Sequence, residues 1–178
     1  MNSIELEDFG EQLPDIMSLS VIMEKTPSEN KWIDFNYNAI GVVAGDNKEE
    51  SSVRQIYNKE GVEKYLFSGL SLQLYADECE SYYHNLMSPK PGCYVVAGET
   101  NDINDMPTPY LVSLSFDEAH AYLEGDETVY AVDIPPELYR WTEAFILTHY
   151  VAIKKTKRKL KNWKGEHKTN TGSSNKLS

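Results

Sequence analysis

The chain has 178 residues, 40% of them hydrophobic and 11% aromatic, which suits one folded domain with flexible ends. Its net charge of −11 argues against nucleic acid as the main partner of the folded body, because phosphates would be repelled. The longest apolar runs, such as residues 39–44, are far shorter than the ~20 residues of a membrane span. The acidic N-terminus shows no signal-peptide pattern, so we expect a cytoplasmic protein.

The first half of the chain predicts strands separated by turns. Residues 1–18 are acidic and poorly patterned, and we expect them to form a loose arm ahead of a domain over residues 19–153. A strand over residues 19–25 ends at a turn cluster, and an extended segment follows over residues 31–44. Residues 45–61 are polar and are predicted to form an inserted loop.

The second half of the chain alternates strands with helices. Leucines at every second position predict a half-buried strand ending near residue 75, and acids in the first turn favour a short helix over residues 77–87. Further strands are expected over residues 93–97, 110–115 and 128–134. A second short helix begins at Ser115, which forms a predicted capping box with Glu118.

Pro135 and Pro136 open the longest predicted helix, because proline is tolerated at the first helical position. Leu138, Trp141 and Phe145 share one face of it. Short connections and mixed patterning favour an α+β domain over a doubly wound sheet. We therefore predict one mostly antiparallel sheet of five or six strands, two short helices and a long C-terminal helix.

The last 25 residues carry the opposite charge to the rest of the chain. Residues 154–178 contain nine Lys or Arg and one acid, whereas residues 1–153 contain eight basic residues and 27 acids. Such asymmetry is typical of a protein that docks onto a partner, because it steers association. The alternatives are a solubilising end to the helix and a tail that binds nucleic acid or anionic lipid.

Two strings place a carboxylate and a histidine on one helix face. Glu80 and His84 are four residues apart, and His120 follows Glu118 with Glu124 four residues further on. If the two helices faced each other, the set Glu80, His84, Glu118 and His120 would suit a metal-dependent enzyme. A solvated helix start is the simpler interpretation, so we assign no catalytic residue, metal or other cofactor.

Cys79 and Cys93 are fourteen residues apart and lack the C-x-x-C spacing of redox or zinc sites, so we expect buried, inert thiols.

Three stretches of the chain resemble an uncharacterised bacterial family, DUF3305. They are residues 31–43, a DE-x-E-x-Y-x-x-NL string over residues 77–86, and an EA-x-AYL-x-G string over residues 118–125. The resemblance spans about residues 19–150, and the polar insertion is atypical. It implies a link to molybdenum-containing formate dehydrogenases, beside which members are often encoded. Some members are also labelled as molybdopterin-guanine dinucleotide biosynthesis proteins, but this sequence lacks a G-x-G-x-x-G or G-x-x-x-x-G-K-[ST] motif to bind phosphates.

We therefore expect a non-catalytic accessory protein that binds a larger protein partner, a molybdoenzyme, and that serves the maturation or assembly of a molybdenum-containing formate dehydrogenase or is a subunit attached to it. A metal-dependent Glu/His enzyme and a nucleic-acid binder are the alternatives. Of the adjacent tyrosines Tyr82 and Tyr83, one must point outward. The expected contact residues lie in the first short helix and in the tail: Asp77, Glu78, Tyr82, Tyr83, Lys154, Lys155, Lys157, Arg158, Lys159, Lys161 and Trp163.

Overall fold

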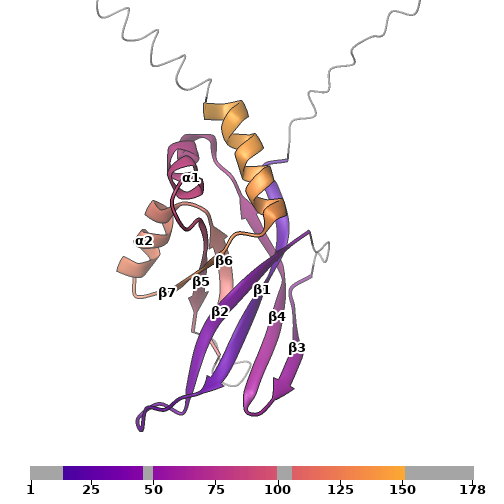
Figure 1. Cartoon of the computed structure of the whole chain (residues 1–178), viewed down its shortest axis with the longest axis vertical. Coiled ribbons are helices and arrows are strands. Elements are labelled where there is room, and N and C mark those ends of the chain that lie inside the picture. Colours follow the sequence, from indigo (N-terminus) through magenta and orange to yellow (C-terminus); the bar gives the residue numbers. More distant parts are fainter. Residues whose placement is uncertain (1–13, 46–49, 100–105, 151–178) are drawn as a thin grey trace, which may run out of the picture.

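A computed structural model describes residues 14–45, 50–99 and 106–150 (Figure 1). A single 3-10 turn, Ala76–Glu78, leads into the first α-helix, and a further helix covers residues 136–150. The remaining elements in chain order are β1 (Ile16–Pro27), β2 (Phe35–Ala44), β3 (Ser52–Lys59), β4 (Val62–Gln73), α1 (Cys79–Leu86), β5 (Gly92–Gly98), β6 (Thr108–Ser113), α2 (Phe116–Glu124) and β7 (Thr128–Asp133).

The strands form two antiparallel sheets. The first has four strands in the order β2-β1-β4-β3, and the second has three in the order β6-β5-β7. The sheets meet where β4 contacts β6 and β2 contacts β7. Apolar side chains that point between them make one core, to which the helices add Leu86, Leu138 and Phe145. The α+β class and the antiparallel pairing are confirmed, but a single sheet of five or six strands is wrong.

The strand missed by the sequence analysis is β3, which lies within the predicted insertion loop over residues 45–61. Every residue of β3 is exposed, so the strand shows no burial pattern. It pairs with β4 through a two-residue turn in which Glu60 and Gly61 both have positive φ, the geometry of a tight hairpin. Hydrogen bonding to β4 therefore defines the strand, and burial does not.

The predicted N-terminal arm also differs from the structure at its end. β1 begins at Ile16, so the last residues of the arm belong to the first sheet. The indole Nε1 of Trp141 donates a hydrogen bond to the Pro14 carbonyl at 2.7 Å, which ties this segment to the helix over residues 136–150. Residues 1–13 lie outside the described part of the chain.

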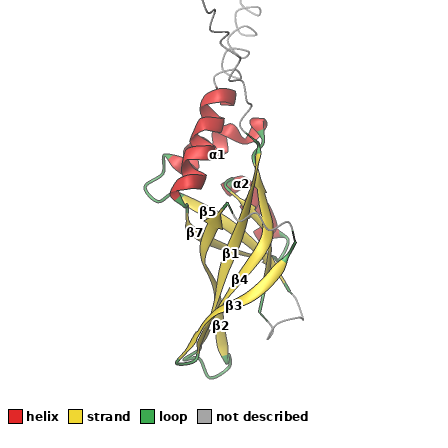
Figure 2. Cartoon of the chain, turned by 90° about the vertical axis from the view of Figure 1, so that its right-hand side faces the viewer, coloured by secondary structure: helices red, strands yellow, loops and turns green. Residues whose placement is uncertain are grey.

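Helices and hairpins lie at opposite ends of the molecule. Figures 1 and 2 show α1 and the helix over residues 136–150 at one end, which we call the helical pole. The β1–β2 and β3–β4 turns lie at the other end, which we call the hairpin pole. Of the predicted long C-terminal helix, residues 136–150 are described as helical, and the basic tail lies outside the described residues.

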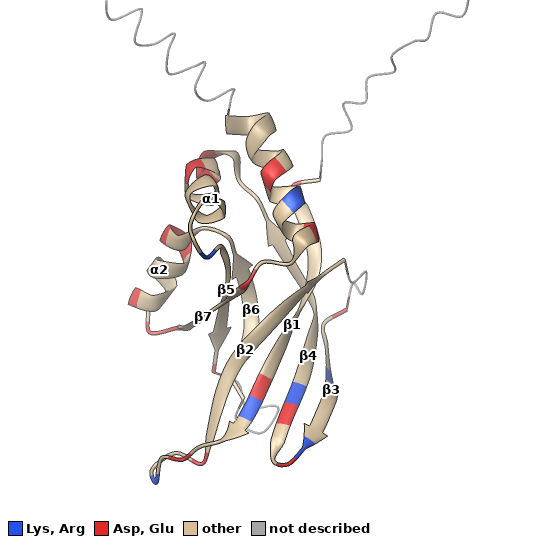
Figure 3. Cartoon of the chain, viewed as in Figure 1, with Lys and Arg blue, Asp and Glu red and all other residues tan. Residues whose placement is uncertain are grey.

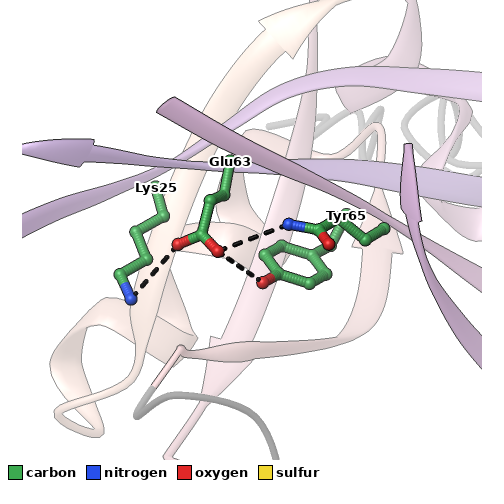
Figure 4. Close-up of polar contacts among 4 residues, drawn as sticks. Lys25, Glu63 and Tyr65 are labelled. Atoms are coloured by element: carbon green, nitrogen blue, oxygen red, sulfur yellow. Dashed lines mark hydrogen bonds and ion pairs between the residues drawn. The ribbon is translucent and has the colours of Figure 1, made fainter. Parts of the chain in front are cut away.

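A polar network braces the hairpin half of the first sheet (Figure 4). Lys25 of β1 and Glu63 of β4 are paired in register, with Nζ 3.4 Å from Oε2. The side chain of Lys25 is only 9% exposed, and its Nζ lies 4.0 Å from the centre of the Phe35 ring. The other carboxylate oxygen of Glu63 accepts hydrogen bonds from Tyr65 Oη and Gln55 Nε2. The network thus connects all four strands.

Replacing Glu63 with Ala should lower the free energy of unfolding by about 2 kcal/mol, because it leaves the buried Lys25 cation without its partner. The neighbouring pair Glu24–Lys64 provides a matched control, since it joins the same strands at 3.7 Å with side chains 25% and 32% exposed. Glu24→Ala should cost less than about 1 kcal/mol. Urea unfolding of both variants checks this, and equal losses would contradict it.

Candidate protein-binding surface

The starts of α1 and α2 lie against each other and share one hydroxyl group. Ser115, the N-cap of α2, accepts a hydrogen bond from the Glu118 amide at 3.2 Å, as the predicted capping box requires. The Ser115 hydroxyl in turn donates a hydrogen bond to Glu78 Oε2 at the start of α1, 3.0 Å away. Ser81 Oγ lies 3.0 Å from Ser115 Oγ and is therefore the donor of that pair. One buried serine thus satisfies groups on both helices.

The second bond of the capping box, between the Glu118 carboxylate and the Ser115 amide, is made indirectly through the hydroxyl of Ser113. The Glu118 carboxylate accepts a hydrogen bond from Ser113 Oγ at 2.7 Å, and that oxygen accepts one from the Ser115 amide at 3.0 Å. A direct bond from the Ser115 amide to Glu118 was expected. The carboxylate of Glu118 is therefore committed to the cap.

Two further residues of the DE-x-E-x-Y-x-x-NL string hold α1 in place. Asn85 is buried and bonds to three backbone groups, the N–H and C=O of Gly92 and the C=O of Leu114. The Tyr82 hydroxyl accepts a hydrogen bond from the Tyr75 amide at 3.0 Å. Burial raises the pKa of Tyr82 well above its usual range, with the nearby carboxylates of Glu118 and Glu78 adding to the shift.

The predicted contact residues separate into buried and exposed ones. Tyr82 is only 1% exposed, so its assignment to a contact surface is wrong, and its neighbour Tyr83, 40% exposed, is the tyrosine that points outward. Asp77 is exposed, and Glu78 is half-buried against Ser115. The tail residues Lys154, Lys155, Lys157, Arg158, Lys159, Lys161 and Trp163 lie outside the described part of the chain.

The four candidate metal ligands do not converge in the structure. His84 lies 3.8 Å from Glu80 on α1, and His120 lies 3.5 Å from Glu124 on α2, in pairs with well-exposed side chains. Within residues 14–45, 50–99 and 106–150, no three His, Cys, Asp or Glu side chains are grouped to hold a metal ion.

Both cysteines are buried free thiols, as predicted. Burial raises the pKa of Cys79 to about 11, with a smaller contribution from Asp77, and raises the pKa of Cys93 to about 12. Because the thiolate is the reactive form, neither group is activated near neutral pH.

An apolar groove of about 340 Å³ lies between α1 and the helix over residues 136–150 at the helical pole. Its exposed apolar members are Leu147 at 65%, Met87 at 57% and Tyr83 at 40%. The rings of Tyr83 and Tyr150 stack at one side with centroids 5.8 Å apart and planes 9° from parallel. The full lining consists of Tyr83, Leu86, Met87, Glu143, Ile146, Leu147 and Tyr150.

Sequence reasoning identified Tyr83 but missed the rest of this groove. The buried core residues Phe145 and Ile146 are followed directly by the exposed Leu147, so the apolar side of this helix is wider than its core face. The width of this apolar face was the feature of the sequence that could have indicated the groove, because a helix that packs against one layer needs only one apolar stripe. The sequence around Met87 gave no indication of the groove, because a single apolar residue at the end of a helix is common.

A second hollow, between α1 and α2, is more polar. It is lined by Ser81, His84, Asn85, Ser88, Tyr94, Phe116 and Asp117. Ser81 in its wall bonds to Ser115 between the two helix starts, Asn85 bonds to the backbone at Gly92 and Leu114, and Ser88 bonds to the Asn85 carbonyl. The polar side chains of this hollow therefore already serve the contacts that hold α1 in place. The exposed apolar side chains of Leu147, Met87 and Tyr83 lie in the groove instead.

These observations define an α+β protein of two antiparallel sheets, with an apolar groove between two helices at one end. The model of a family described as "Protein of unknown function (DUF3305)" matches residues 18–159, so the chain belongs to this family, and the resemblance read from the sequence is confirmed. No curated protein and no solved structure matches the chain. Among the described residues, no helix is both long and apolar enough to span a membrane.

Replacing Ser115 with Ala should lower the free energy of unfolding by about 2 kcal/mol, because it removes an N-cap and leaves buried groups of both helices unsatisfied. Thr148→Ala is the control, since Thr148 is exposed and its hydroxyl bonds to the Ala144 carbonyl one turn earlier in the same helix. The control should change stability by less than about 0.5 kcal/mol. Thermal and urea unfolding measure both, and a neutral Ser115→Ala would show that the network adds no stability.

Proposed function

We propose that this protein is a non-catalytic accessory protein that binds a larger protein through the groove at its helical pole. The observation that carries the proposal is the exposure of Leu147, Met87 and Tyr83 on adjoining faces of two helices. Apolar side chains gathered on a folded surface mark a site where another molecule removes them from water.

The occupant that fits the groove best is an amphipathic helix of the partner. Two helices form its walls, and a third helix laid between them would bury its apolar stripe as helix-in-groove complexes do. Glu143 lines the groove, and Asp77 and Glu80 are exposed on the neighbouring helix end. Figure 3 shows acidic positions, in red, on the ribbons of α1 and of the helix over residues 136–150 at the helical pole. Lysine or arginine beside the apolar stripe of the partner would complement them.

The family resemblance suggests which partner to test. Because it implies a link to molybdenum-containing formate dehydrogenases, we propose that the partner is such an enzyme, in the cytosol, and that this protein serves its maturation or assembly or attaches to it as a subunit. The two exposed Glu/His pairs and the capped Glu118 give no support to a metal-dependent reaction.

The basic tail supplies the second contact in this proposal. Residues 154–161 bring six Lys or Arg to a chain that is otherwise acidic, and in sequence they begin four residues after Tyr150, which lines the groove. A tail that binds an acidic patch on the same partner adds affinity by effective concentration.

Replacing Leu147 with Glu should weaken binding to purified molybdenum formate dehydrogenase at least about tenfold, because the new charge would be buried in an apolar contact. Leu123→Glu is the matched control, since Leu123 is 50% exposed on α2 and does not line the groove. Titration with biolayer interferometry measures both affinities. No binding by the unaltered chain would exclude this partner, and equal affinities for the two variants would exclude the groove.

Deleting residues 154–178 should weaken the same complex more at about 20 mM salt than at about 300 mM, because salt screens exposed charges. The deletion removes nine basic residues and one acid, so the net charge falls from −11 to −19. A shorter deletion, residues 165–178, keeps seven of the nine basic residues and should bind almost normally. Unchanged affinity for the longer deletion at both salt concentrations would refute the second contact.

A further inference from the structure

A tryptophan at the hairpin pole is almost fully exposed. Trp32 lies in the turn between β1 and β2, with 92% of its surface open to solvent. Ile33 is 50% exposed beside it and Phe35, at the start of β2, is 39% exposed. The apolar tip therefore lies at the opposite end of the molecule from the groove (Figures 1 and 2).

Hydrogen bonds within the turn fix the backbone that carries the indole. The Asn30 side chain accepts from the Trp32 amide at 3.1 Å, and the Ser28 hydroxyl accepts from the Asn30 amide at 3.1 Å. The Ser28 amide donates to the Asp34 carbonyl at 3.0 Å, closing the loop at its base. An anchor held in this way loses less conformational entropy on binding than one on a floppy loop.

The strands beneath the turn are braced as well. Lys25 contacts the Phe35 ring on one side and the Glu63 carboxylate on the other. Pro27 lies against the neighbouring hairpin, where a Cβ atom added at Gly61 would come within 3.0 Å of the Pro27 ring. The two hairpin ends are thus packed against each other, and the turn that carries the indole is braced by these contacts.

We propose that Trp32 is the anchor of a second protein-binding surface, and that its partner is a folded protein with an apolar pocket that receives the indole. A projecting tip needs a concave recipient, and buried tryptophans supply much of the binding energy where they occur in interfaces. Exposed Glu29, Asp34 and Glu60 outnumber Lys31 and Lys59 around the tip. That balance disfavours an anionic membrane, which binds basic surfaces.

A photo-crosslinking experiment tests this inference on the full chain. A benzoylphenylalanine placed at position 32 in the source cell should capture one discrete protein on irradiation, and the same residue at position 57 should not. Tyr57 is the matched control because it is an aromatic residue, 40% exposed, on the edge strand β3 of the same sheet. The captured protein is then purified and its affinity for the unaltered chain measured.

Trp32→Ala should weaken that affinity at least about tenfold while leaving the melting temperature unchanged, and Tyr57→Ala should alter it less than about twofold. Absence of a captured protein, or equal binding by Trp32→Ala, would overturn the inference. Capture of a second copy of the chain would overturn it too, as would Trp32-dependent binding to phosphatidylcholine–phosphatidylglycerol vesicles. Leu147→Glu alters the groove at the other pole and should leave binding to the captured protein unchanged. The two variants together therefore distinguish a failure of the Trp32 inference from a failure of the groove proposal.

Discussion

The Ser115 hydroxyl fixes the relative position of the two short helices, because it bonds to the start of α2 and to Glu78 at the start of α1. Asn85 adds bonds from the same side of α1 to the backbone at Gly92 and Leu114. With 3.6 residues per turn, a helix held by this side must turn Tyr83 and Met87 away from α2. The apolar groove therefore depends on a polar network on the other side of the same helix.

The residues that carry the family resemblance serve mainly this network. Glu78, Tyr82, Asn85 and Glu118 belong to the two helical strings, and each accepts or donates a hydrogen bond that positions α1 or α2. Their residue types are thus explained by the fold. The proposed contact surface consists largely of residues outside those strings, such as Leu147. Membership of the family consequently accounts for the architecture better than for the partner.

Acidic groups and apolar anchors recur at both ends of this protein. The helical pole combines the groove with Glu143, and the hairpin pole combines Trp32 with Glu29 and Asp34. The Lys25–Glu63 network connects the strands of the first sheet in the hairpin half. Two proposed contacts, one at each end of the body, suit a protein that joins two partners.

The sequence by itself determined most elements between residues 19 and 150, since alternation, capping residues and prolines act within a few positions. It determined neither β3 nor the division into two sheets, because an edge strand is defined by hydrogen bonds to a distant partner and leaves no burial pattern. It also left open which of Tyr82 and Tyr83 points outward. That choice, like the meeting of Ser115 with Glu78, was decided only when helices 37 residues apart in sequence packed together, where buried polar groups must find partners.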